Sequence, residues 1–160
     1  MQDIMAYDEA HYFDLGTAEE PNITLGGVIT EISESSNPTE TEKQYIQDKS
    51  KRTSVTGYSN EFPLTMDMGK GDDVFEDFYQ KFYLRKTGSD LNIDHYIVNL
   101  WEEESETPGT YKARKITNTV SITEMTNTAG EQKTITGSLK GGDFTYGTFA
   151  VATKTFTPEA

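Results

Sequence analysis

The sequence predicts a mainly β fold: a β-sandwich or a barrel of antiparallel strands with one flanking α-helix at about 72–87. Alternating apolar and polar residues recur along most of the chain, and threonine, a residue suited to half-buried strands, is abundant. Only residues 72–87 combine helical periodicity with helix end signals. Because no helices alternate with the strands, a parallel doubly wound sheet is not expected. The length of 160 residues fits a single domain over 1–160.

The composition and charge of the chain exclude several classes of protein. It has no cysteine, so disulfides, thiolate zinc sites and thiol catalysis are excluded. No apolar run approaches the roughly 18 residues of a transmembrane helix, and we expect no membrane partner. The acidic N-terminal residues lack the pattern of a signal peptide. The formal net charge of −13 opposes binding to the outside of nucleic acid or to an anionic membrane.

Six stretches have the alternation or the branched residues of strands. They are residues 22–33, 53–68, 92–101, 110–125, 132–140 and 144–156. Gly26 and Gly27 in the first stretch indicate a bulge or a close approach of the backbone. Pro63 cannot donate a ladder hydrogen bond, so it is expected at an edge or a bulge.

The expected helix has signals at both ends. Asp72 and Asp73 can cap its first amides, and Gly88 is expected to end it in the left-handed conformation. Its apolar residues recur every four positions, which requires packing on a large apolar surface such as a sheet. These residues are Val74, Phe78 and Phe82.

Two polar segments lack the apolar periodicity of the rest. Residues 1–21 read as a polar N-terminal arm. Residues 34–52 are rich in serine, threonine and charge and are long for a connection in a compact domain. Such a segment is either a solvated flexible loop or a surface that orders against a partner.

A search for catalytic and metal-binding residues finds little. Only His11 and His95 can act as a base near neutral pH, and we expect His11 to be exposed and His95 to pack on the sheet. The acidic turn at 102–106 lacks the ligand spacing of a calcium loop. Trp101 can stack on a sugar or a base, although core packing is the simpler account. We expect no enzymatic activity and no cofactor.

Three stretches of the chain carry a resemblance to a known family. They are Arg52–Phe62, leading into a strand that ends near Asp67; the helix start at Gly71–Phe75; and Ile135–Phe149, where a strand, a Gly-Asp turn and a Gly-Thr-Phe strand follow one another. In this order they resemble the major tail tube protein of long-tailed, non-contractile bacteriophages. The likeness covers about residues 22–157.

The resemblance implies a β-sandwich or half-barrel with one helix, six copies of which close a ring around a continuous lumen. Stacked rings would form a virion tail tube, assembled in the host cytoplasm, through which DNA passes without specific binding. The implied partners are further copies of the chain, the tape measure protein and the tail terminator. Ring stacking would use residues 34–52, with contacts expected at Glu40, Glu42, Tyr45, Ile46, Lys49, Lys51 and Arg52.

An anionic lumen would repel DNA and keep it centred in water. Strand alternation and strand ends give four candidates for lumen-facing residues: Glu31, Asp67, Glu124 and Glu131. Two other functions stay open. One is the inner tube of a contractile tail or of a tail-like secretion device. The other is a monomeric β-sandwich module that binds carbohydrate or a host surface through Trp101 and exposed tyrosines.

Overall fold

The structure, a computed structural model, describes all residues from 1 to 160. Strands hold 49% of the residues and there is one α-helix, which confirms the mainly β prediction. In chain order the elements are η1 (Ala6–Asp8), β1 (Glu9–Asp14), β2 (Ile23–Leu25), β3 (Ile29–Ile32), β4 (Thr39–Lys43), β5 (Arg52–Gly57), β6 (Glu61–Asp67), α1 (Asp73–Tyr83), η2 (Gly88–Leu91), β7 (Asn92–Glu103), β8 (Thr110–Thr126), β9 (Thr134–Gly141), β10 (Thr145–Ala150) and β11 (Thr155–Pro158).

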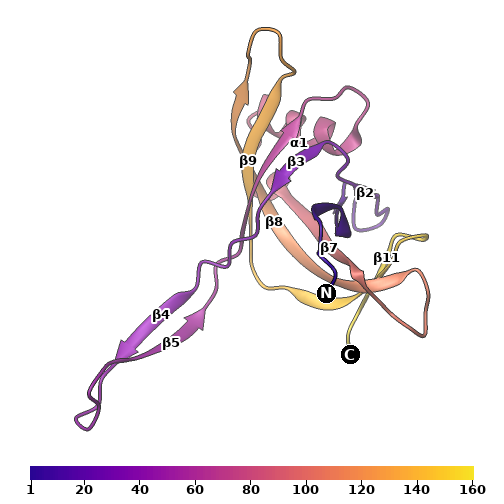
Figure 1. Ribbon diagram of the computed structural model, residues 1–160. Helices are drawn as coiled ribbons and strands as arrows, with labels where there is room; N and C mark the ends of the chain where they lie inside the picture. Colours follow the sequence, from indigo (N-terminus) through magenta and orange to yellow (C-terminus); the bar gives the residue numbers. More distant parts are fainter.

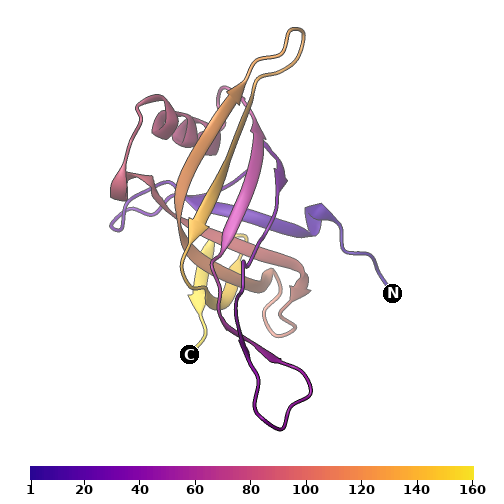
Figure 2. The same cartoon turned by 90° about the vertical axis from the view of Figure 1, so that its left-hand side faces the viewer.

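Nine strands form one antiparallel sheet organised around β8. The main path through the sheet is β2-β1-β7-β8-β9-β6-β3, and β10 and β11 branch from β8. One edge of β8 pairs with β7, while the other edge pairs first with β10 and then with β9. Strands β9 and β10 therefore lie end to end along β8, and the sheet curls into an open half-barrel (Figures 1 and 2). No ladder joins β2 to β3, so the sheet stays open there.

The two faces of the sheet bury two separate apolar clusters. The larger cluster lies between one face and α1 and contains Phe13, Phe62, Leu64, Met66, Val74, Phe75, Phe78, Ile93, Ile97, Ile116, Val120, Ile135 and Leu139. The smaller cluster lies on the opposite face beside β10 and contains Ala10, Tyr12, Tyr96, Val98, Ala113 and Phe149. Strands β1 and β7 contribute to both clusters, so their buried residues are consecutive rather than alternating.

The helix begins where the sequence predicts and ends earlier. Asp72 caps it, with its Oδ1 accepting a hydrogen bond of 2.9 Å from the backbone N–H of Phe75. The expected stop at Gly88 is wrong, because α1 ends at Tyr83 and Arg85 takes the left-handed conformation with φ of 50°. Phe78 is the last fully buried residue of the stripe, so later turns have little surface to pack on. No helix in the structure has the length and apolar character to cross a membrane.

Three expected strands are each divided in the structure. The stretch 53–68 is broken between β5, which pairs only with β4, and β6 of the nine-stranded sheet. The stretch 22–33 is broken between β2 and β3, where a Cβ on Gly26 would lie 2.7 Å from Cδ1 of Ile29 and 3.1 Å from Cε2 of Phe13. This contact confirms the expected close approach. The stretch 144–156 is broken between β10 and β11 by a turn in which Lys154 has φ of 52°.

The expected polar N-terminal arm contains a strand of the sheet. Residues 9–14 form β1, which lies between β2 and β7 and buries Tyr12 and Phe13. This strand is difficult to predict from the sequence, because the residues around it are acidic and only the short run around Tyr12 and Phe13 is apolar. The side chain of His11 is only 12% exposed, so its expected exposure is wrong.

The long polar segment forms a projecting hairpin. Strands β4 and β5 pair with each other and with no other strand, and they extend away from the half-barrel (Figure 1). We call residues 39–57 the arm. The sequence indicated its length and polarity, but β4 consists of threonine, glutamate and lysine and gives no apolar strand signal.

A substitution at Gly137 tests the close approach of β9 to β8. A Cβ at this position would lie 2.4 Å from the carbonyl oxygen of Ser121 and 2.8 Å from Cα of Ile122. We expect Gly137→Ala to lower the free energy of unfolding by about 1–3 kcal/mol, measured by urea denaturation, because backbone must move. Gly142→Ala is the matched control, since nothing lies within 4 Å of its Cβ. Equal stability of the two variants would contradict this packing.

Candidate functional site

One face of the half-barrel is polar and rich in hydroxyl groups. Alternation along β6 sends Phe62, Leu64 and Met66 into the core and the intervening residues to solvent. The same alternation holds along β9 and along the second half of β8 as far as Ile122, where a bulge leaves both Thr123 and Glu124 exposed before the alternation resumes. We call the solvent side of these strands and β3 the polar face. Its members include Thr30, Glu31, Glu61, Thr65, Asp67, Thr119, Ser121, Thr123, Glu124, Thr126, Thr134, Thr136, Ser138 and Lys140.

The structure brings three of the four lumen candidates onto this face. Glu31 is paired in register with Thr65, Asp67 with Thr134, and Glu124 with Thr136. Glu131 lies beyond the face, in the turn between β8 and β9. Sequence reasoning missed Glu61, although it has the same alternation as Asp67. The polar face thus carries four carboxylates and one ammonium group.

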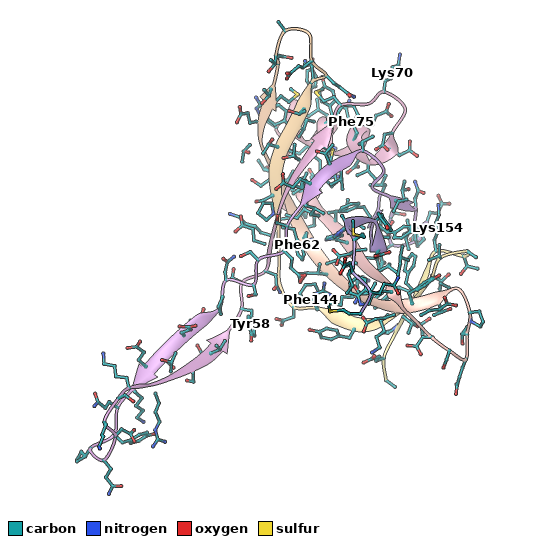
Figure 3. All side chains as sticks on the ribbon, viewed as in Figure 1. Tyr58, Phe62, Lys70, Phe75, Phe144 and Lys154 are labelled. Atoms are coloured by element: carbon teal, nitrogen blue, oxygen red, sulfur yellow. The ribbon has the colours of Figure 1, made fainter.

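The arm exposes nearly all of its side chains to solvent. Figure 3 shows them standing clear of the half-barrel, beyond Tyr58 at the base. All seven residues expected to make contacts lie on the arm, from Glu40 in β4 to Arg52 at the start of β5. A two-stranded hairpin is marginally stable in water by itself. The length and exposure of the arm therefore favour a segment that is covered by another molecule.

The tip of the arm is organised around Tyr45. The ammonium of Lys43 lies 5.0 Å from the centre of its ring, and the guanidinium carbon of Arg52 lies 5.4 Å from it. Arg52 also pairs with Asp48 at 2.7 Å. Ile46, next to the ring, is fully exposed. The tip thus presents two apolar side chains surrounded by cations.

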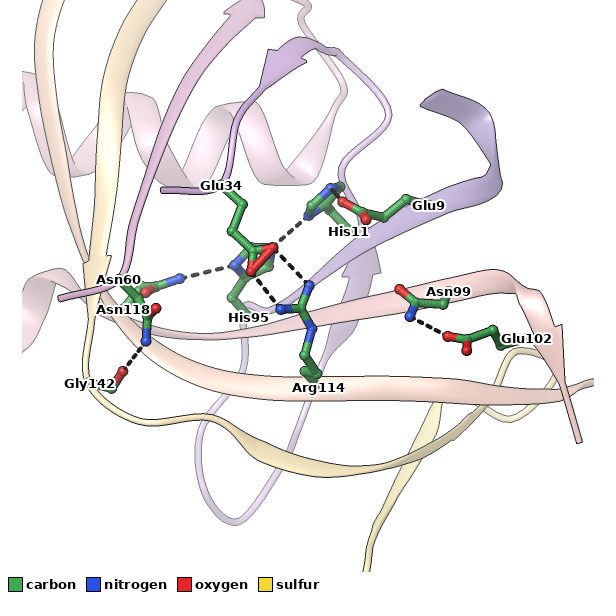
Figure 4. Close-up of polar contacts among 10 residues, drawn as sticks. All are labelled: Glu9, His11, Glu34, Asn60, His95, Asn99, Glu102, Arg114, Asn118 and Gly142. Carbon is green, nitrogen blue, oxygen red and sulfur yellow. Dashed lines mark hydrogen bonds and ion pairs between the residues drawn. The ribbon is translucent and has the colours of Figure 1, made fainter. Parts of the chain in front are cut away.

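The base of the arm is fixed to the half-barrel by polar contacts (Figure 4). Nη1 and Nη2 of Arg114 donate to the two carboxylate oxygens of Glu34, at 2.5 and 2.9 Å. Burial opposes the charge on Arg114, but the hydrogen bonds and charge of Glu34 outweigh it and raise the pKa of Arg114. Asn60 Nδ2 donates to the carbonyl oxygen of Gly142 at 2.7 Å. These contacts set where the arm leaves β3 and joins β6.

A chain of hydrogen bonds links the two histidines across the sheet (Figure 4). Asn118 Nδ2 donates to Nδ1 of His95 at 3.0 Å, which leaves the proton of His95 on Nε2. His95 Nε2 then donates to Nδ1 of His11 at 2.9 Å, and Nε2 of His11 donates to Glu9 at 2.9 Å. His95 is completely buried and stacks on Phe13, as expected for a histidine packed on the sheet.

The histidine chain offers no free ring nitrogen at its buried end. It contains no nucleophile, and both ring nitrogens of His95 are occupied by neighbouring side chains. No group of three or more histidine, aspartate or glutamate side chains in the structure could hold a metal ion.

An apolar groove lies beside the N-terminal segment. It measures about 730 Å³ and is lined by residues 4–7 and 9–12, by residues 25–27 and 29–32 from the end of β2 through β3, and by Leu100 and Trp101 of β7. Trp101 lines it and is 41% exposed, so the expectation of core packing for this residue is wrong. Leu25, which also lines the groove, is 47% exposed. No pattern in the sequence indicates this groove, because its walls come from three separate segments.

Comparison with known proteins identifies the fold. No family model matches the chain and no curated protein matches it in sequence, whereas 17 chains of solved structures match its fold. The SPP1 tail tube matches with a TM-score of 0.70 and 14% identity, over 90% of this chain and 78% of that one. The tail of an empty GTA particle, determined with C6 symmetry, matches at 0.59 and 9% identity, over 99% and 100%. The baseplate of the anti-feeding prophage, six-fold symmetrised, matches at 0.52 and 10% identity, over 91% and 96%.

These structures define the class of fold. At such low identities they show the fold alone, and the fold is that of phage tail tube proteins. The resemblance found in the sequence is confirmed at this level.

His95 should make the stability of the protein depend on pH. Burial, with smaller contributions from the charges of His11 and Arg114, holds the pKa of His95 well below its usual value. The unfolded chain therefore binds a proton that the folded chain excludes. As far as His95 is concerned, the free energy of unfolding should have its full value above about pH 7. It should fall by up to about 1.4 kcal/mol per pH unit below about pH 6.5.

Urea denaturation between pH 7.5 and 5.5 measures this dependence, and His95→Gln is the comparison variant. The variant should be less stable at neutral pH but should lose less stability on acidification. An identical pH slope in both proteins would show that His95 is protonated in the fold.

Proposed function

We propose that this chain is a structural protein of a phage tail tube, which polymerises as stacked rings, six copies in each, around an electronegative lumen that conducts DNA. The observation that carries the proposal is the combination of a tail tube fold with an uncovered projecting arm. In this proposal the protein forms the wall of the tube and catalyses no reaction. It would reside in the virion after assembly in the host cytoplasm, with the tape measure protein and the tail terminator as its other partners.

Self-association follows from the surfaces that the single chain leaves open. Strands β2, β3 and β11 lie at the ends of their ladders, and the arm pairs only with itself. Unpaired strand edges and an uncovered hairpin favour addition of a neighbouring chain. A ring of identical copies removes the edges, and the arms then join one ring to the next.

The polar face supplies the electrostatics that a DNA conduit needs. Four carboxylates and one ammonium per copy would place a charge of −18 on the inner wall of a six-membered ring. DNA carries one negative charge per about 1.7 Å of its axis, so this wall would repel it. Repulsion acts over a Debye length of about 8 Å, and threonine and serine hydroxyls keep the intervening layer wet.

A second function of the same class is the inner tube of a contractile tail or tail-like secretion device. The match to the anti-feeding prophage baseplate favours it. Both functions need the same ring, arm and lumen, so the tests below apply to either.

The arm tip should be required for tubes but not for folding. We expect replacement of residues 44–51 by an Asn-Gly turn to abolish tubes in negative-stain images while leaving the melting temperature unchanged, because the tip has no buried contact with the half-barrel. Intact tubes from this variant would contradict the role of the arm.

The polar face should exclude DNA from the lumen. Tubes of the triple variant Glu61→Lys, Asp67→Lys and Glu124→Lys, assembled with short linear duplex DNA, should protect that DNA from nuclease, because a cationic lumen retains it. Wild-type tubes should protect none.

The matched control carries Glu19→Lys, Asp90→Lys and Glu159→Lys, which are exposed residues away from the polar face. It has the same net charge as the triple variant, yet it should leave any bound DNA open to digestion. Equal protection by both variants would show that the polar face does not line the lumen.

A further inference from the structure

The tip of the arm is chemically unlike the rest of the chain. Between Lys43 and Arg52 it carries four cationic side chains and one acidic one, in a chain whose formal net charge is −13. Lys43 and Lys49 have no ion-pair partner within the chain, whereas Arg52 and Lys51 pair within the arm. At the centre of these charges lie Tyr45, 51% exposed, and Ile46, fully exposed.

The groove beside the N-terminal segment has the opposite charge around a similar apolar centre. Ile4, Met5, Leu25, Leu100 and Trp101 line it, and its charged lining residues are Glu9 and Glu31, with no lysine or arginine. The strand that carries Trp101 continues into the acidic turn 102–106. At about 730 Å³ the groove is within the size range that encloses a small ligand, and two side chains fit such a space.

The arm of the same molecule does not occupy this groove. Figures 1 and 2 show the arm leaving the half-barrel with its tip remote from the N-terminal segment. The base of the arm is held in that direction by the Glu34–Arg114 pair and by Asn60. An arm tip that enters this groove must therefore come from another molecule.

We propose that the arm tip of one copy inserts Tyr45 and Ile46 into the groove of a second copy, with the cations of the tip facing Glu31 and the acidic turn. This inference rests on the proposed self-assembly and names the surface that receives the arm. Apolar burial at the centre provides affinity, and the opposed charges select the orientation.

The geometry of this contact favours an open-ended assembly. The arm and the groove are different surfaces, so each copy can give one contact and receive another. Such head-to-tail contacts continue indefinitely when rotation does not close them. Each added ring would present a fresh set of arms at one end and unfilled grooves at the other. Glu31 then lies at the boundary between the polar face and the groove.

Cysteine cross-linking tests the contact directly, because the natural chain has no cysteine. The double variant Ile46→Cys with Leu25→Cys should form disulfide-linked ladders on oxidation of assembled tubes, since a disulfide requires Cα atoms within about 7 Å. The matched control pairs Ile46→Cys with Leu84→Cys, an exposed leucine at the end of α1. We expect at least about tenfold more cross-linked chain in the groove variant than in the control.

The outcomes separate this inference from the proposed function. Tubes that give no cross-links through Leu25→Cys, or equal cross-links in the control, would overturn the docking and leave the tube function standing. A wild-type protein that forms no tubes would overturn both.

Charge exchange gives a second test that does not depend on cysteine geometry. The arm variant Lys43→Glu with Lys49→Glu, and the groove variant Glu31→Lys with Glu106→Lys, should each raise the protein concentration needed for tubes by about tenfold. Combining all four changes in one chain should restore assembly, since the opposed charges are then matched again. Failure of the combined variant to improve on either parent would argue against this pairing.

Discussion

The pairing of β8 with three strands determines the architecture of the protein. This strand contains neither glycine nor proline over its 17 residues, so one continuous strand can hold β7 along one edge and both β10 and β9 along the other. A shift of one residue in the pairing register of β8 would turn Ile116, Asn118 and Val120 out of the core. Asn118 helps to fix the register through its hydrogen bond to His95, and a Cβ on Gly141 would lie 2.2 Å from Oδ1 of Asn118.

The surfaces proposed to act in assembly are all placed by this sheet. The solvent side of β8 is part of the polar face, and Arg114 on the same strand holds Glu34 at the base of the arm. Trp101, on the neighbouring strand β7, lines the groove. Because these surfaces lie on the nine-stranded sheet or are anchored to it, the direction of the arm and the facing of the polar side chains are set together. Repetition of a single chain can then produce a regular wall.

The sequence predicted those parts of the fold that depend on local periodicity. The alternation from Phe62 to Met66, the cap at Asp72 and the buried stripe of β8 are all properties of neighbouring residues. Strand β1 escaped notice because its buried residues face both sides of the sheet and therefore do not alternate. The early end of α1 could not be predicted from the sequence. Residues with helix propensity continue past Tyr83, whereas the apolar surface on which the helix packs does not. The histidine chain joins residues 84 positions apart, and the groove joins the N-terminal segment to Trp101; no local pattern records either contact.

The central claim is that copies of this chain assemble through their arms into a tube whose bore is lined by the polar face. Cryo-electron microscopy of the purified wild-type protein tests it most directly, at a resolution that places individual strands. The account predicts open-ended tubes in which β3, β6, β9 and the second half of β8 form the inner wall and each arm contacts a neighbouring ring. A monodisperse 17.9 kDa particle, or tubes with this face turned outward, would contradict it.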